Sequence, residues 1–204
     1  MRLWELFQKG GPIMWPLLVT SIIATTVVIE RVIFIVRERS RRSPETVDKI
    51  LSALEDGDLD SALLAGHKSK DFVSRTLVYG LAHRESSFAN ALLRAANLEL
   101  NRFSQGIVVL DTIITLAPLL GLLGTVTGMI RAFSLLGGSE LSAPAAITGG
   151  IAEALIATAF GLAIAIISLI PFNYLNSLSE RARHEIEDAS SHVELLLTRE
   201  EERS

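Results

Sequence analysis

One acidic residue lies inside an apolar stretch in the C-terminal half of the chain. Glu153 is flanked on both sides by uncharged residues, 147–152 and 154–160. If this stretch spans a membrane, an ionisable side chain there costs roughly a few kcal/mol unless it is paired, protonated or turned toward water. We therefore expect Glu153 to face a helix interface or a hydrated cavity. There it either makes a structural hydrogen bond to a neighbouring helix or takes part in moving protons.

Small residues recur at intervals of three or four positions in two apolar stretches, which is the spacing of one face of a helix. The first stripe consists of Ala117, Gly121, Thr125, Gly128 and Ala132, and the second of Gly150, Ala154, Thr158, Gly161 and Ala165. Small side chains let helix backbones approach closely in lipid. The residues that we predict to pack the helices together are Gly121, Gly124, Gly128, Gly150, Ala154 and Gly161.

A threonine lies at the centre of each stripe, Thr125 in the first and Thr158 in the second. A threonine hydroxyl can bond to its own helix backbone, or it can offer a donor and an acceptor to water in a pore. Together with Glu153, the two hydroxyls form a narrow polar track. Glu30 and Asp111 lie nearer the cytoplasmic ends, so no second buried carboxylate is expected at the same depth. The residues predict one half of a proton pathway, completed by a partner or another subunit.

Three uncharged runs supply the elements that must hold these residues. They are Gly10–Ile29, Thr112–Ile130 and Ala154–Ser179, of 20, 19 and 26 residues. A helix of about 20 residues crosses the ~30 Å hydrocarbon core of a bilayer. The chain is 49% hydrophobic, with a mean hydropathy of +0.40. We predict an all-α integral membrane protein with three transmembrane helices, over residues 13–36, 107–136 and 147–178.

The distribution of Lys and Arg predicts the orientation. Residues 37–106 contain eleven of them, the N-terminal segment 1–12 contains two, the 179–204 tail contains four and the 137–146 turn contains none. The positive-inside rule then places the N-terminus and the turn outside, and 37–106 and the tail in the cytoplasm. Four arginines follow the first span and are predicted to anchor it at the anionic inner leaflet: Arg37, Arg39, Arg41 and Arg42.

The cytoplasmic segment 37–106 has helical patterning. Pro44 marks a helix start, and apolar residues recur at helical spacing through Leu54. Further helices are expected from Leu59, over 72–84 and over 87–103. The last contains no Gly or Pro before Gly106, so we expect it to continue into the second span as one helix. The third span should likewise continue through the tail, which gives two spans with long cytoplasmic extensions.

Several classes of function lack the residues that they need. The chain has no cysteine, and no pair of its four histidines has ligand spacing with a carboxylate partner. Asp56, Asp58 and Asp60 lack the later Glu and the glycine of a calcium loop, so a solvated turn is expected. No metal site is predicted. The net charge of −4 gives no sign of nucleic-acid binding. One carboxylate at membrane depth, with no histidine beside it, does not predict an enzyme.

Three segments carry a resemblance to a known family. They are Lys9–Leu17 with the later Glu30-Arg31, Ala117–Met129 and Ile151–Leu162. In order and spacing they resemble the three spans of the MotA/TolQ/ExbB proton-channel family, and most closely its ExbB members. A MotA-type protein would have four spans and a larger cytoplasmic segment, so that branch is disfavoured. A TolQ-type protein, which acts in envelope integrity, shares the three-span plan and stays an alternative.

The resemblance implies a subunit of a motor in the bacterial inner membrane. Members like ExbB form a ring of five subunits around the single-span helices of an ExbD-like partner, whose aspartate takes up and releases protons. H⁺ is then the coupling ion, with no cofactor, and a TonB-like protein transmits the work to outer-membrane transporters. Thr125 and Thr158 fall on the family's pore threonines and Glu153 on its membrane glutamate. A membrane scaffold in which Glu153 is purely structural is the competing class of function.

Overall fold

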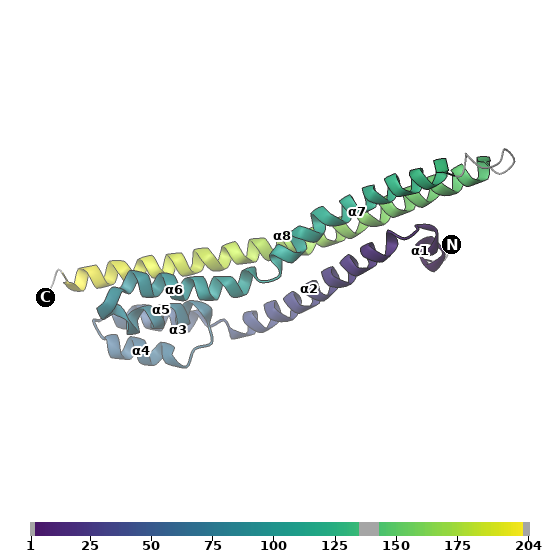
Figure 1. Ribbon diagram of the computed structural model, residues 1–204. Coiled ribbons are helices and arrows are strands. Elements are labelled where there is room, and N and C mark those ends of the chain that lie inside the picture. The colour runs from purple at the N-terminus through teal and green to yellow at the C-terminus, as the bar shows by residue number, and fades with distance from the viewer. Residues whose placement is uncertain (1–2, 135–142, 202–204) are drawn as a thin grey trace. The chain divides into compact units, whose positions relative to one another are not determined.

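The computed structural model describes residues 3–134 and 143–201, which form helices with no strand in these two ranges (Figure 1). The helices in chain order are α1 (Leu3–Lys9), α2 (Met14–Arg41), α3 (Pro44–Glu55), α4 (Leu59–His67), α5 (Phe72–Ala82), α6 (Arg84–Ser104), α7 (Ile107–Ser134) and α8 (Ala143–Glu201). The chain divides into two compact units. The first contains residues 1–30 and 106–174, and the second contains 31–105 and 175–204.

Three helical stretches are long and apolar enough to cross a membrane: Met14–Arg41, Ser87–Ser134 and Ile147–Arg199. Only 17%, 28% and 22% of their most apolar windows is buried within the chain. A water-soluble helix of this composition would bury its apolar side chains, so the exposed faces are suited to lipid or to other chains. The all-α fold with three spanning helices is confirmed.

One expected helix is interrupted. The prediction of a single helix from 87 through the second span is wrong at Gln105 and Gly106, which separate α6 from α7. Gln105 has an extended ψ of 133° and Gly106 has a φ of +79°. Glycine reaches a positive φ without the steric cost that other residues incur, so Gly106 provides the break. In contrast, α8 runs without interruption from Ala143 to Glu201, as predicted for the third span and its tail.

The outside turn and the N-terminal segment are the two remaining parts of the predicted organisation. Residues 137–142 of the expected outside turn, and the last two residues of the second predicted span, lie outside the described residues. The N-terminal segment contains a short helix, α1, that the sequence patterning did not predict. Its Trp4 stacks on Phe7 with 5.6 Å between ring centroids, and Phe7 meets Trp15 edge-on at 5.3 Å. Both tryptophans are well exposed, as expected for aromatic residues at a membrane–water interface.

The first unit is held together by close contact between the backbones of α7 and α8, which lie side by side (Figure 1). A Cβ added at Gly161 would lie 2.5 Å from the carbonyl oxygen of Ala117. A Cβ at Gly128 would lie 2.9 Å from the carbonyl oxygen of Gly150. Since backbone atoms fill the space where these side chains would be, the small residues at these positions set the distance between the two helices.

The second unit has a core like that of a water-soluble bundle. Leu77, Ile50 and Val193 are fully buried there, with side chains from α3, α4, α5, α6 and the C-terminal part of α8 around them. Phe103 meets Phe34 and Phe72 edge-on, with ring centroids 5.4 and 5.0 Å apart. This core packs several helices around one another rather than exposing apolar faces, as in a bundle surrounded by water. The cytoplasmic placement of 37–106 stays a prediction.

A buried carboxylate joins the helices of the second unit. Asp71 is fully buried and accepts hydrogen bonds from both the guanidinium of Arg42, at 2.9 Å, and the backbone N–H of Ser43, at 2.8 Å. It also caps α5 by accepting from the backbone N–H of Val73 at 2.9 Å. The guanidinium of Arg42 lies 4.6 Å from the ring centroid of Phe72. Because a buried charge requires this many partners, Asp71 fixes where α2 ends and α5 begins.

The acidic turn at 56–58 caps the next helix. Gly57 has a φ of +76°, and the carboxylate of Asp58 accepts hydrogen bonds from the hydroxyl and the backbone N–H of Ser61. These hydrogen bonds, that from the hydroxyl first, hold the pKa of Asp58 below its ordinary value. The turn thus begins α4 through an N-cap.

Two adjacent glycines allow a matched test of the α7–α8 packing. A Cβ at Gly150 would lie 2.6 Å from the Cβ of Ala132 and 2.8 Å from the carbonyl oxygen of Gly128, whereas a Cβ at Gly149 would meet nothing within 4 Å. We expect Gly150→Ala to destabilise the protein by about 1–3 kcal/mol through overpacking. Gly149→Ala should have no effect or a slight stabilising one, since alanine favours helix. The melting temperatures of the two detergent-purified variants check this, and equal melting temperatures would contradict it.

Candidate functional site

Glu153 of α8 forms an ion pair with Arg131 of α7. The Nη1 atom of Arg131 lies 2.9 Å from the Oε1 atom of Glu153. The Glu153 side chain is 17% exposed and that of Arg131 is 53% exposed. The pair is possible because the small residues bring α7 and α8 together. It satisfies the requirement that a charge within a span be paired.

The turn between α1 and α2 also contacts Glu153. Gly11 has a φ of +72°, and a Cβ at this position would clash with the carboxylate of Glu153. The neighbouring Gly10 lies against Met14 and Ile156. The positive φ therefore favours glycine at position 11, and any larger residue would also displace the Glu153 carboxylate. The turn formed by the Gly-Gly-Pro sequence before α2 therefore lies against the carboxylate of Glu153.

Thr158 joins the two helices. Its hydroxyl donates a hydrogen bond to the carbonyl oxygen of Gly121 on α7 at 3.0 Å. A Cβ at Gly121 would lie only 3.0 Å from the Cα of Thr158. The absence of a side chain at 121 therefore gives the hydroxyl access to a backbone carbonyl of the neighbouring helix.

Thr125 bonds to its own helix. Its hydroxyl donates to the carbonyl oxygen of Leu122 at 2.6 Å, which is one of the two arrangements expected from the sequence. The side chain is half-buried and borders an apolar face of α7. Val126, Ile130 and Phe133 on this face are 50%, 63% and 59% exposed. The face is therefore suited to contact with lipid or with another chain.

The α7–α8 pair brings the three predicted pore residues to one part of the first unit, yet each has a separate partner. Glu153 binds Arg131, Thr158 binds Gly121 and Thr125 binds Leu122. Thr158 lies five positions after Glu153, which is about 7.5 Å along a helix. The partner of Glu153 was not predicted. The available signal was that Arg131 is the sole basic residue of the 107–136 span.

The four arginines after the first span differ in their surroundings. Arg37, Arg39 and Arg41 are exposed. Arg42 binds the buried Asp71 and also forms an ion pair with Glu185. The role of these residues as membrane anchors stays a prediction, and for Arg42 the structure adds a role within the second unit. Within the part of the chain that the structure describes, no group of three or more His, Cys, Asp or Glu residues could hold a metal ion.

Comparison with known proteins establishes the family. The model of the MotA/TolQ/ExbB proton channel family matches residues 67–188, which is more than half of the chain. The chain belongs to this family. The matched range includes the pair Arg131–Glu153 and both threonines. Membership in a proton channel family and three spanning helices together describe a multi-pass membrane protein.

Two of three relatives named ExbB or ExbB-like match nearly the whole chain, and the third matches part of it. ExbB-like 1 of Synechocystis, a biopolymer transport protein by name, is 40% identical over 202 residues, covering 96% of this chain and 79% of that protein. An ExbB homolog of Methanothermobacter thermautotrophicus is 29% identical over 195 residues, covering 94% and 67%. The biopolymer transport protein ExbB of Neisseria gonorrhoeae is 43% identical over 77 residues, covering 38% and 35%.

A double-mutant cycle tests the ion pair. Glu153→Gln and Arg131→Gln should each destabilise the detergent-purified protein, because each leaves one charge without its partner. The double variant should lose less stability than the sum of the two, with a coupling free energy of about 1 kcal/mol. Thermal unfolding of the four proteins measures this coupling. Additive losses would mean that the two side chains do not interact in the folded protein.

Proposed function

We propose that this chain is an ExbB-like subunit of a proton-driven motor in the bacterial inner membrane, with its N-terminus outside and its C-terminus in the cytoplasm. With a single-span, ExbD-like partner it uses the proton-motive force, and a TonB-like protein carries the work to transport across the outer membrane. The observation that carries the proposal is the Arg131–Glu153 pair inside a span of a proton channel family member. The biopolymer transport names of its relatives also support it.

A single copy of this chain holds only part of a pathway. Its three polar groups have separate partners, and much of its apolar surface on α7 is exposed. A ring of identical subunits uses the same heterologous contact at every interface, which would cover such faces. We therefore propose a homopentamer, as the resemblance implies, with the partner's single helix supplying the second carboxylate.

The ion pair suggests how the partner would act. Arg131 has five N–H donors, is 53% exposed and uses Nη1 on Glu153. A deprotonated carboxylate on the partner would be attracted to the remaining donors, and protonation would release it. Glu153 would keep Arg131 in place between these events. Protonation of the partner's carboxylate would thereby change the contact between the partner and the ring.

Two alternatives use the same residues. In a TolQ-type subunit the same machinery would serve envelope integrity rather than transport. In a scaffold without its own proton role, Glu153 would only connect α7, α8 and the N-terminal turn, and the helix-bonding hydroxyls of Thr125 and Thr158 favour this second alternative. The scaffold and the motor differ in whether the negative charge at 153 is needed once the complex has assembled.

Glu153→Gln tests this difference. The amide keeps most of the hydrogen bonding and the size of the side chain but loses the charge. We expect the variant to assemble with its partner and to lose at least about tenfold in proton flux into liposomes under an applied pH gradient, a change of about 1.4 kcal/mol or more.

The control is Glu45→Gln, which removes an exposed carboxylate from the first turn of α3 and should leave the flux unchanged. Copurification of the partner is measured for both variants. Undiminished flux in an assembled Glu153→Gln complex would favour the scaffold.

A further inference from the structure

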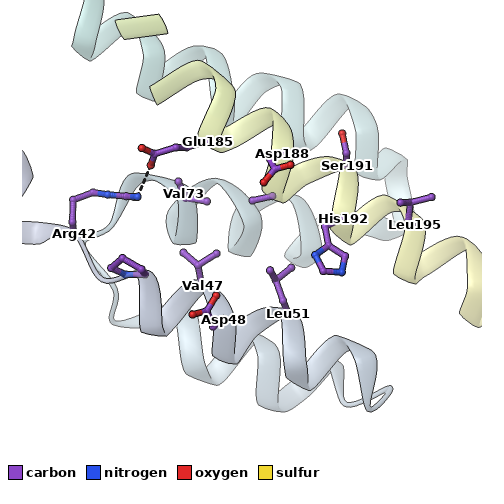
Figure 2. Close-up of a pocket in the computed structure, with 12 residues that line it drawn as sticks. Arg42, Val47, Asp48, Leu51, Val73, Glu185, Asp188, Ser191, His192 and Leu195 are labelled. Carbon is purple, nitrogen blue, oxygen red and sulfur yellow. Dashed lines mark hydrogen bonds and ion pairs between the residues drawn. The ribbon is translucent and has the colours of Figure 1, made fainter. Parts of the chain in front are cut away.

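A cleft opens in the second unit between α3 and the C-terminal part of α8 (Figure 2). It has a volume of about 430 Å³. The apolar side chains that line it are Val47 and Leu51 of α3, Val73 of α5, and Ala189 and Leu195 of α8. Leu195 is 66% exposed and does not belong to the buried core of this unit. The cleft is therefore a place where an apolar side chain from another segment would gain by burial.

The charged groups that face the cleft are mainly acidic. Asp48 lies on α3, and Glu185 and Asp188 lie on α8. The one arginine that lines the cleft, Arg42, is bound to the buried Asp71 and to Glu185. Asp48 and Asp188 are exposed and have no ion-pair partner among the described residues.

His192 is the other titratable group of the cleft. Its Nε2 atom lies 3.6 Å from a carboxylate oxygen of Glu55, and in Figure 2 its ring points toward the space between the two helices. His192 is thus next to the carboxylate of Glu55, and the apolar side chains that line the cleft are surrounded mainly by carboxylates. The cleft is complementary to a segment that has both basic and apolar side chains.

The cleft belongs to a segment predicted to lie just inside the membrane. Arg42 and Pro44 directly follow α2, and residues 185–195 belong to the predicted cytoplasmic tail. By the positive-inside rule, a single-span partner is enriched in Lys and Arg at the cytoplasmic end of its span. Such a basic flank would be next to the membrane at the same side as the cleft.

We propose that the cleft binds the basic cytoplasmic flank of the single-span partner, with one apolar side chain of that flank against Leu51 and Leu195. This inference rests on the proposed function, because it requires such a partner. The carboxylates Asp48 and Asp188 bind the Lys or Arg side chains on either side of the apolar one. The contact holds the partner at the cytoplasmic end of its span.

The chain has no native cysteine, so disulfide cross-linking reports on one introduced pair. Leu195→Cys is co-expressed with a partner that has one cysteine in its cytoplasmic flank, and the copurified complex is oxidised. We expect a cross-link between the two chains. The matched control is Leu64→Cys, on α4 of the same unit and outside the cleft, whose native side chain is 77% exposed. It should not cross-link above background.

Charge variants test the acidic rim in the same complex. Asp48→Asn with Asp188→Asn should lower the cross-linked fraction roughly three- to tenfold, the effect of losing two exposed ion pairs. Raising the salt concentration should lower it in the native-charge protein. Asp56→Asn with Asp60→Asn removes the same net charge from an exposed turn outside the cleft and should leave the cross-linked fraction unchanged.

The outcomes separate this inference from the proposed function. A partner that copurifies but does not cross-link to Leu195→Cys above the Leu64→Cys control overturns the inference and leaves the motor proposal intact. A cross-link that instead joins two copies of this chain assigns the cleft to subunit contact and also overturns it. If the partner does not copurify at all, both proposals fail.

Discussion

The first unit depends on one constraint: a carboxylate within a membrane span requires a partner. Arg131 supplies that partner at 2.9 Å from Glu153. The pair can form only if α7 and α8 approach closely, and the small residues of both helices allow this approach. The same carboxylate lies against the N-terminal turn, where Gly11 has both the positive φ and the open space that the contact requires. Glu153 therefore connects three features of the first unit: the packing of α7 against α8, the turn before α2 and the ion pair within the span.

The two units satisfy the same physical rules in different surroundings. In the first, apolar side chains stay exposed on the helix faces and close contacts are made by Gly, Ala and Thr, because lipid gives apolar surfaces no reason to associate. In the second, apolar side chains are buried in a core and charges form pairs such as Arg42–Asp71. The chain thus combines one part that pairs a charge within a span with one part that has a folded core of its own.

The sequence allowed the general architecture to be predicted, since a run of about twenty uncharged residues has few alternatives to a spanning helix. Glu153 was also recognisable, because an ionisable residue within an apolar run is costly and is visible from its neighbours in the sequence. The small-residue stripes were recognisable because their helical spacing is a local pattern. The partner of Glu153 was not, because it depends on how α7 and α8 align, which no local pattern specifies. The break at Gly106 was missed because glycine is tolerated in many helices, and only the backbone angles reveal that here it ends one. The cleft joins residues 42–51 with 185–195, and patterning within either segment gives no sign of it.

In the proposed function, this chain supplies one half of a proton pathway and a partner supplies the other. The most direct test is the mass of the complex in detergent by native mass spectrometry, with the chain expressed alone and then with a single-span, aspartate-bearing partner. We expect a homopentamer whose mass increases by whole copies of the partner when both are expressed. A monomer, or an oligomer whose mass does not change with the partner present, would leave Glu153 without a second carboxylate and contradict the account.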